Sequence, residues 1–139
     1  MKINVLTCLD CQDRLISYHR HDFKRCSCGA SFLDGGFDYI RYGGNNVVLE
    51  EKNIKDMRDL ISSTFQWTQN YDENNNRIDS KTALLKDLTS SHICGILSYF
   101  TERLTKQEKD TIVAPTKEWC VIHEIFIQEL DYRIKNQLI

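Results

Sequence analysis

Two cysteine pairs lie close together near the start of the chain: Cys8-Leu-Asp-Cys11 and, fourteen residues later, Cys26-Ser-Cys28-Gly29. Pairs with this spacing form short turns that present both sulfurs to one metal ion, and four sulfurs complete a tetrahedral site. The sequence therefore predicts one structural Zn²⁺ ion with four ligands: Cys8, Cys11, Cys26 and Cys28. Four protein ligands leave no open coordination position, so we expect no catalysis at the metal.

Other interpretations of this stretch are weaker. A redox dithiol at Cys8 and Cys11 would need a surrounding βαβ pattern, which the sequence lacks. Four cysteines also hold iron–sulfur clusters. His19 and His21 lie between the pairs and offer substitute ligands. The favoured role of His21 with Asp22 is to hydrogen-bond the loop backbone or groups beside the metal site.

Length and composition indicate an ordinary soluble protein. The chain has 139 residues, 41% hydrophobic and 27% charged, with a formal net charge of −2. No apolar run is long enough to cross a bilayer, and the N-terminus lacks the apolar segment of a signal peptide. We therefore expect a cytoplasmic protein without a membrane partner, in which the six cysteines favour zinc over disulfides. The oligomeric state stays open.

The pattern predicts an α+β fold in two parts, residues 1–46 and 47–139. The first part is expected to be a zinc-ribbon-like antiparallel β module, followed by a β-hairpin and an antiparallel C-terminal helix pair. The expected strands of the module are residues 2–7, 14–24, 30–33 and 37–42.

The second part opens with an expected helix over 51–62 and a hairpin over 62–85. A helix starting at 89–91 presents one apolar face, made of Ile93, Ile96, Leu97, Phe100 and Leu104. A polar loop is expected at 105–114. The last helix is expected from Pro115 or Thr116 to about Gln137. Its predicted buried stripe is Trp119, Ile122, Ile125, Phe126, Leu130 and Ile134.

Several further groups have a functional and a structural interpretation. The basic residues Arg14, Arg20, Lys24, Arg25 and Arg41 suggest a nucleic-acid patch, but interleaved aspartates favour a solvated face. The stretch 34–39 is expected as a tight turn rather than a recognition loop. Free buried cysteines are expected at positions 94 and 120, rather than a second metal site with His92 and His123.

Two further expectations concern charged residues. Glu129, Asp131, Arg133 and Lys135 are expected to form a solvated helix face with i,i+4 pairs such as Glu129–Arg133. A catalytic site between the two parts, using His21, Asp22, Asp34 or Tyr39, is the least favoured alternative.

Two stretches carry resemblances. The first third of the chain resembles a family of small zinc-ribbon-like proteins of unknown function, often encoded by bacteriophages. Its motifs are Cys8-x-x-Cys11, His21-Asp22-Phe23, Cys26-x-Cys28-Gly29, Asp34-Gly35-Gly36 and Asp38-Tyr39-x-Arg41. The later part is more loosely similar to a hairpin-plus-two-helix module of other uncharacterised phage proteins. That likeness uses Phe65-x-Trp67, Leu85-x-Asp87-Leu88, Ser91-His92-Ile93, Ile96-Leu97, Trp119 and Glu129-Leu130-Asp131-x-Arg133.

Neither resemblance carries an established activity. The first implies a phage accessory protein in a bacterial cytoplasm. We expect a non-enzymatic, zinc-stabilised protein that binds and modulates a host protein, such as a polymerase, nuclease or defence component. The alternative is a nucleic-acid-binding zinc ribbon that acts in transcription or replication. It is less favoured because the negative net charge and the cysteine thiolates would bind a phosphate backbone poorly.

Overall fold

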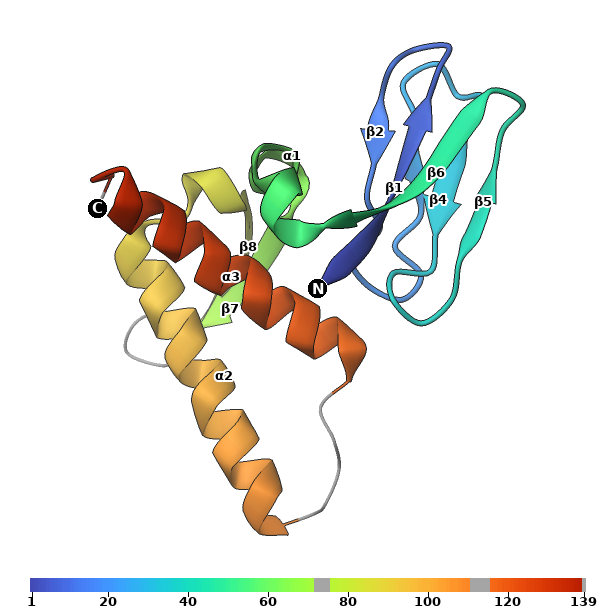
Figure 1. Ribbon diagram of the computed structural model, residues 1–139. Coiled ribbons are helices and arrows are strands. Elements are labelled where there is room, and N and C mark those ends of the chain that lie inside the picture. Colours follow the sequence, from blue (N-terminus) through green and yellow to red (C-terminus); the bar gives the residue numbers. More distant parts are fainter. Residues whose placement is uncertain (72–75, 111–115, 139) are drawn as a thin grey trace.

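The computed structural model describes the backbone of residues 1–71, 76–110 and 116–138, and their side chains except those of Tyr71 and 103–110 (Figure 1). The fold is α+β, with antiparallel sheets and a C-terminal helix pair. Its strands are β1 (Lys2–Cys8), β2 (Arg14–Leu15), β3 (Lys24–Arg25), β4 (Phe32–Asp34), β5 (Arg41–Gly43), β6 (Val47–Asn53), β7 (Gln66–Tyr71) and β8 (Arg77–Leu84). The helices are η1 (Ile54–Met57), α1 (Arg58–Thr64), η2 (Leu85–Asp87), α2 (Ser90–Asp110) and α3 (Lys117–Lys135).

Six short strands form a β module at one end of the molecule, and the helices and the β7–β8 hairpin form the other end (Figure 1). The module contains two three-stranded antiparallel sheets, ordered β2-β1-β6 and β3-β4-β5. Each of its two sheets contributes to the cysteine turns. Cys8 ends β1, and Cys26 directly follows β3.

The single strand expected over 14–24 is wrong. The chain forms β2 and β3 in different sheets, and residues between them turn back on themselves. The carboxylate of Asp22 accepts the backbone N–H of Tyr18, and the carbonyl of Asp22 accepts the Ser17 hydroxyl (2.7 Å). His21 has a φ of +64°, which an extended strand does not allow. The 37–42 strand is likewise shortened to β5, because Asp38 and Tyr39 donate to the Gly35 carbonyl in a turn.

The helix expected over 51–62 begins later. Residues 47–53 instead form β6, which pairs with β1 over all of its length, from Val47 with Cys8 to Asn53 with Lys2. The Asn53 side chain then caps η1 by accepting the Lys55 N–H, and α1 follows. Residues 47–53 therefore share a sheet with the N-terminal strand, while the division into domains at residues 46 and 47 stays a prediction.

One hydrophobic core joins the two ends. It contains Ile3, Val5, Ile16 and Tyr18 of the β module together with residues of α1, η2, α2 and α3. Aromatic rings form its centre: Phe65 packs edge-on against Tyr18 and Phe126, with centroids 5.1 and 5.5 Å apart. This shared core holds the β module against the helices.

The predicted hairpin and helix pair are present. The hairpin tip, 72–75, lies outside the described residues. Thr116 caps α3 by accepting the Trp119 N–H, while Pro115 and the Leu104 side chain lie outside the described part. α2 continues to Asp110, so the loop expected from residue 105 is wrong up to that point. The two helices run in opposite directions and lie closest where α2 begins and α3 ends (Figure 1).

The solvated face expected on α3 is partly wrong. Glu129 and Arg133 do pair, with Arg133 Nε donating to Glu129 Oε1 at 3.0 Å, but both are buried. Arg58 of α1 donates to both carboxylate oxygens of Glu129. Burial disfavours the charge of Arg58, yet the hydrogen bonds to Glu129 raise its pKa above the ordinary value. In the expected buried stripe, Ile134 is 54% exposed.

Candidate metal centre and neighbouring surfaces

The first cysteine turn follows directly from the end of β1. The Cys8 carbonyl accepts the Gln12 N–H at 2.7 Å, and the Cys8 N–H donates to the Asp13 carbonyl. Gln12 takes a left-handed φ of +66°, which turns the chain back toward β2. These bonds form the turn that carries both Cys8 and Cys11.

The second turn follows β3 and is closed by its own backbone. Gly29 donates its N–H to the Cys26 carbonyl, and its φ of +76° suits a residue without a side chain. The Ser31 N–H donates to Cys26 Sγ at 3.3 Å. The two turns are also joined directly, because the Ser27 N–H donates to Asp13 Oδ2 at 2.6 Å.

The four sulfurs of Cys8, Cys11, Cys26 and Cys28 all lie within 4.8 Å of one another. Cys28 Sγ is 3.5 Å from Cys26 Sγ and 3.7 Å from Cys8 Sγ. Four sulfurs around Zn²⁺, each about 2.3 Å from the ion, stand about 3.8 Å apart at the corners of a tetrahedron. The set therefore fits one metal ion, and its geometry does not identify the element.

Local hydrogen bonds give Cys11, Cys26 and Cys28 different pKa values. A hydrogen bond from Ser31 lowers the pKa of Cys26 to about 6 despite the opposing effect of burial. Backbone groups of Asp13 and Cys28 lower the pKa of Cys11. At Cys28 the Ala30 backbone favours the thiolate, but interaction with Cys26 and burial raise the pKa to about 12. A bound cation would favour deprotonation of all four thiols.

The two histidines between the cysteine pairs make other contacts. His21 Nδ1 lies 3.0 Å from the Tyr39 hydroxyl, and His19 Nδ1 lies 3.0 Å from the Arg20 carbonyl. His19 Nε2 is 3.7 Å from Asp22 Oδ1. Neither imidazole belongs to the four-sulfur group. Asp22 organises the loop backbone, which is the role expected for this part of the chain.

The basic residues suggested as one patch are spread over different surfaces. Arg14 reaches the Met57 sulfur, and Lys24 pairs with Asp22 at 3.3 Å. Arg25 and Arg41 share one face of the β3-β4-β5 sheet. Phe32 pairs in register with Arg25 on one side and with Gly43 on the other, so these three residues lie on the same face. Arg41 is two residues before Gly43 and therefore points to that face as well.

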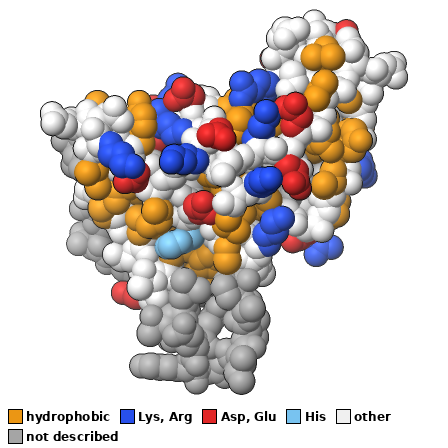
Figure 2. Space-filling view, viewed as in Figure 1, with side chains coloured by type: hydrophobic (Ala, Val, Ile, Leu, Met, Phe, Trp, Pro, Cys, Tyr) orange, Lys and Arg blue, Asp and Glu red, His pale blue; other side chains and the backbone are white. Residues whose placement is uncertain are grey.

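That sheet face carries a row of alternating charged and aromatic groups. Phe23 stacks on Phe32, with centroids 5.3 Å apart and planes inclined by 20°. The Arg25 guanidinium lies over the Phe23 ring, and the Arg41 guanidinium over the Phe32 ring, each at 5.7 Å. We call Phe23, Arg25, Phe32 and Arg41 the aromatic–arginine face. Phe23 is 44% exposed, and Figure 2 shows hydrophobic and basic side chains side by side on the β module.

Phe23 and Phe32 were not predicted to be surface groups. The signal was the alternation Phe23-Lys24-Arg25, which places the ring and the guanidinium on the same side of a strand. Gly43 also contributes. A side chain there would overlap the Phe32 ring, at 2.6 Å from its nearest atom, so the glycine leaves room for the ring to lie across the sheet.

No second metal group of at least three His, Cys, Asp or Glu residues occurs in the part of the chain that the structure describes. Cys94 and Cys120 are free thiols, as expected. The burial expected for them is wrong for Cys94, which is exposed on α2, while Cys120 is half-buried.

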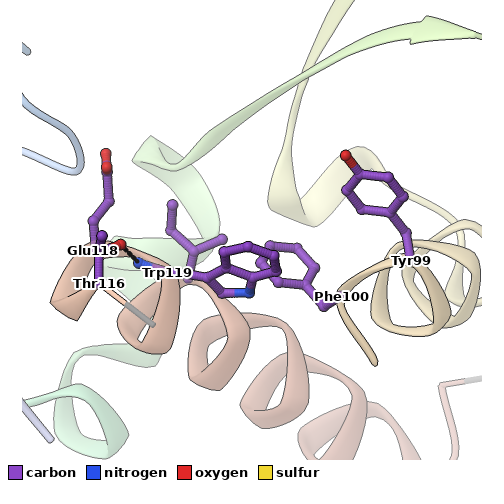
Figure 3. A pocket seen from close by; sticks show the side chains of 6 residues that line it. Tyr99, Phe100, Thr116, Glu118 and Trp119 are labelled. Atoms are coloured by element: carbon purple, nitrogen blue, oxygen red, sulfur yellow. Dashed lines mark hydrogen bonds between the residues drawn. The ribbon is translucent and has the colours of Figure 1, made fainter. Parts of the chain in front are cut away.

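Two hollows within the described part of the chain lie outside the metal centre. One, of about 260 Å³, lies between α2 and α3 (Figure 3). The Trp119 and Phe100 rings meet edge to face there, 5.1 Å apart, with Glu118 and Tyr99 to either side. The other, of about 220 Å³, lies where the β module meets β7. Its walls include His19, Asp22, Lys24 and Trp67.

No helix within the described ranges is both long and apolar enough to cross a membrane. A search of the solved structures and a search of curated proteins each returned no match for this chain. Residues 1–44 match the model of a family described as Domain of unknown function (DUF7695). The match covers the two cysteine turns and strands β1 to β5, so the metal centre and the aromatic–arginine face lie within the region that resembles this family.

Proposed function

We propose that this protein is a non-enzymatic binding protein stabilised by one structural Zn²⁺ ion. Tetrahedral sets of four sulfurs bind either zinc or iron–sulfur clusters. The four sulfurs all lie within 4.8 Å of one another, which supports a single ion, and zinc is the ion usually held by structural sites of four cysteines. Four thiolates fill the coordination sphere and leave no position for a substrate. Zinc here supplies stability, and the surrounding chain supplies the contact surface.

The aromatic–arginine face carries the proposal of a protein partner. Aromatic residues and arginine are enriched among the anchors of protein interfaces. Here Phe23 and Phe32 are already stacked, so they lose little side-chain freedom on binding. A formal net charge of −2 also suits a protein better than a polyanion. The phage resemblance supports a host target, such as a polymerase, nuclease or defence component.

Single-stranded nucleic acid is the second candidate, and the same face favours it. Exposed aromatic rings stack on bases, and flanking guanidinium groups bind phosphates. If the two arginines on this face each contact one phosphate of a single strand, the logarithm of the binding constant should fall with the logarithm of the salt concentration with a slope of about −1.4. The overall charge argues against this candidate, so it ranks second.

Affinity capture from bacterial lysate distinguishes the two candidates. The bait is the full chain with its metal content measured by elemental analysis and absorbance, and the lysate is used with and without nuclease. We expect a protein that survives nuclease treatment, is lost with the Phe23→Ala/Arg41→Gln variant, and is retained by the control Lys81→Gln, whose side chain is exposed on β8. The captured protein is then purified and its binding measured directly.

Three outcomes would contradict the proposal. Recovery of only nuclease-sensitive material would indicate that the protein binds nucleic acid rather than a host protein. Turnover of a nucleotide or nucleic acid by the purified protein, abolished by a point mutation, would show an enzyme. An iron–sulfur absorbance band in protein purified without oxygen would show that the site holds an iron–sulfur cluster instead of zinc.

A further inference from the structure

The hollow between the β module and β7 has features of a small-ligand site. It measures about 220 Å³. Its residues come from three separate regions: the Asp22 loop, the α1–β7 junction and Ile122 of α3. Pockets for drug-sized ligands span roughly 300–1,000 Å³, so this one suits a smaller molecule. The hollow lies off the aromatic–arginine face, because Lys24 points to the opposite side of its strand from Arg25.

The apolar wall is rigid and aromatic. Phe65 and Tyr18 are each 3% exposed and contact one another edge to face. The Tyr18 hydroxyl is satisfied by Thr64 Oγ1 at 2.6 Å. Trp67 is half-buried and is held by edge-to-face packing on Phe126, with centroids 5.2 Å apart. A planar ring entering the hollow would therefore meet a fixed indole surface at little entropic cost.

The polar wall of the hollow, formed by His19, Asp22 and Lys24, has more hydrogen-bond donors than acceptors available to a ligand. Asp22 Oδ2 already accepts the Tyr18 N–H at 2.9 Å, and Oδ1 faces Lys24 Nζ at 3.3 Å and His19 Nε2 at 3.7 Å. The carboxylate is thus engaged on both oxygens, and its side chain is 11% exposed. The Lys24 ammonium carries three donors and pairs with Asp22 at 3.3 Å, while its side chain stays 34% exposed. The unused hydrogen-bonding capacity of this wall favours an acceptor.

We infer that this hollow binds a small aromatic acid, with its ring against Trp67 and its anionic group near Lys24 Nζ. The inference concerns a different part of the molecule from the proposed function and does not depend on it. Lys24 is partly exposed, so its attraction to the acid is partly screened. We expect a charge preference of about two- to fivefold in affinity, as for exposed ion pairs.

The test uses three probes with the same ring: benzoate, benzamide and benzylammonium. In the Trp119→Phe full-length protein, Trp67 is the one remaining tryptophan of the chain's two. Its fluorescence is titrated with each probe at constant ionic strength. We expect saturable quenching in the order benzoate, benzamide, benzylammonium. Lys24→Met should remove the preference for benzoate over benzamide, whereas Lys52→Met, at an exposed lysine of β6, should keep it.

Amide chemical-shift mapping on the unmodified chain gives a second measurement that needs no substitution. Shifts caused by benzoate should cluster at Asp22, Lys24, Gln66 and Trp67, which line the hollow. Absence of saturable quenching by all three probes would overturn the inference. Equal affinities for the three probes would do so as well, as would benzoate shifts centred on residues away from the hollow.

Discussion

The buried carboxylate of Glu129 should be among the most costly side chains to alter. It is 2% exposed and accepts three hydrogen bonds from two arginines, with donor–acceptor distances of 3.0 to 3.1 Å. Glu129→Gln keeps the shape and removes the charge that balances both guanidiniums. Arg133, only 10% exposed, would remain tied to the Leu85 carbonyl without a counter-charge.

The magnitude follows from burial. Breaking a buried ion pair by removing one partner costs about 3–5 kcal/mol. Arg58 is 23% exposed and recovers some hydration, so we expect the lower end, about 3 kcal/mol. The surface pair Asp131–Lys135 on the same helix is a matched control, at 2.9 Å with both side chains more than half exposed. Asp131→Asn should change stability by less than about 0.5 kcal/mol.

Urea unfolding at a fixed excess of Zn²⁺ measures both variants, with circular dichroism and tryptophan fluorescence as probes. Coincident transitions would license a two-state comparison. Equal effects of Glu129→Gln and Asp131→Asn would refute the reasoning. A second check is the double variant Glu129→Leu/Arg133→Met, in which no charge is left stranded between α3 and η2. It should be less destabilised than Glu129→Leu alone.

Three more outcomes are expected. Gly95→Ala should raise stability by about 0.5–1 kcal/mol in thermal or urea unfolding, because Gly95 lies in α2 and, among the described residues, no atom outside the neighbouring helix backbone lies within 4 Å of the added methyl group. Gly36→Ala should lower stability by more than about 1 kcal/mol in the same assay, since Gly36 has a φ of +56° and its new methyl would overlap the His19 backbone. In the metal-free protein, the Cys26 β-carbon shift should titrate near pH 6, below its ordinary value of 9.0. Because the pKa of Cys26 is lowered in the folded state, its thiolate contributes to the stability of the folded metal-free chain fully above pH 9. This contribution to stability is lost as the pH falls through about 6. A Cys26 titration near pH 9 would contradict the effect of the Ser31 hydrogen bond.

The cysteine cluster could be predicted from the sequence because its information is local. Each turn is only a few residues long, and its hydrogen bonds join neighbours such as Gln12 to Cys8 and Gly29 to Cys26. The hairpin and the last two helices were predictable for a similar reason, since their apolar periodicity is contained within each segment.

Strand partners and burial depended on residues far apart in the chain. The apolar spacing of residues 54–61 predicted a helix starting at residue 51, yet residues 51–53 join β6 because β1 offers a full row of backbone partners. Glu129 and Arg133 have the spacing of an exposed ion pair on an isolated helix. Only the packing of α3 against α1 and η2 buries them and brings Arg58, seventy-one residues away, to the same carboxylate.

The two surfaces proposed to bind ligands arise in the same way. Phe23 and Phe32 become one platform through the pairing of β3 with β4, and Lys24 and Trp67 line one hollow only where the β module packs beside the hairpin. The sequence by itself determined which residues could hold a metal, because a chelating turn is made by near neighbours. The tertiary structure decided which charges are buried and which rings are exposed, because burial is a property of what packs against a residue rather than of its place in the chain.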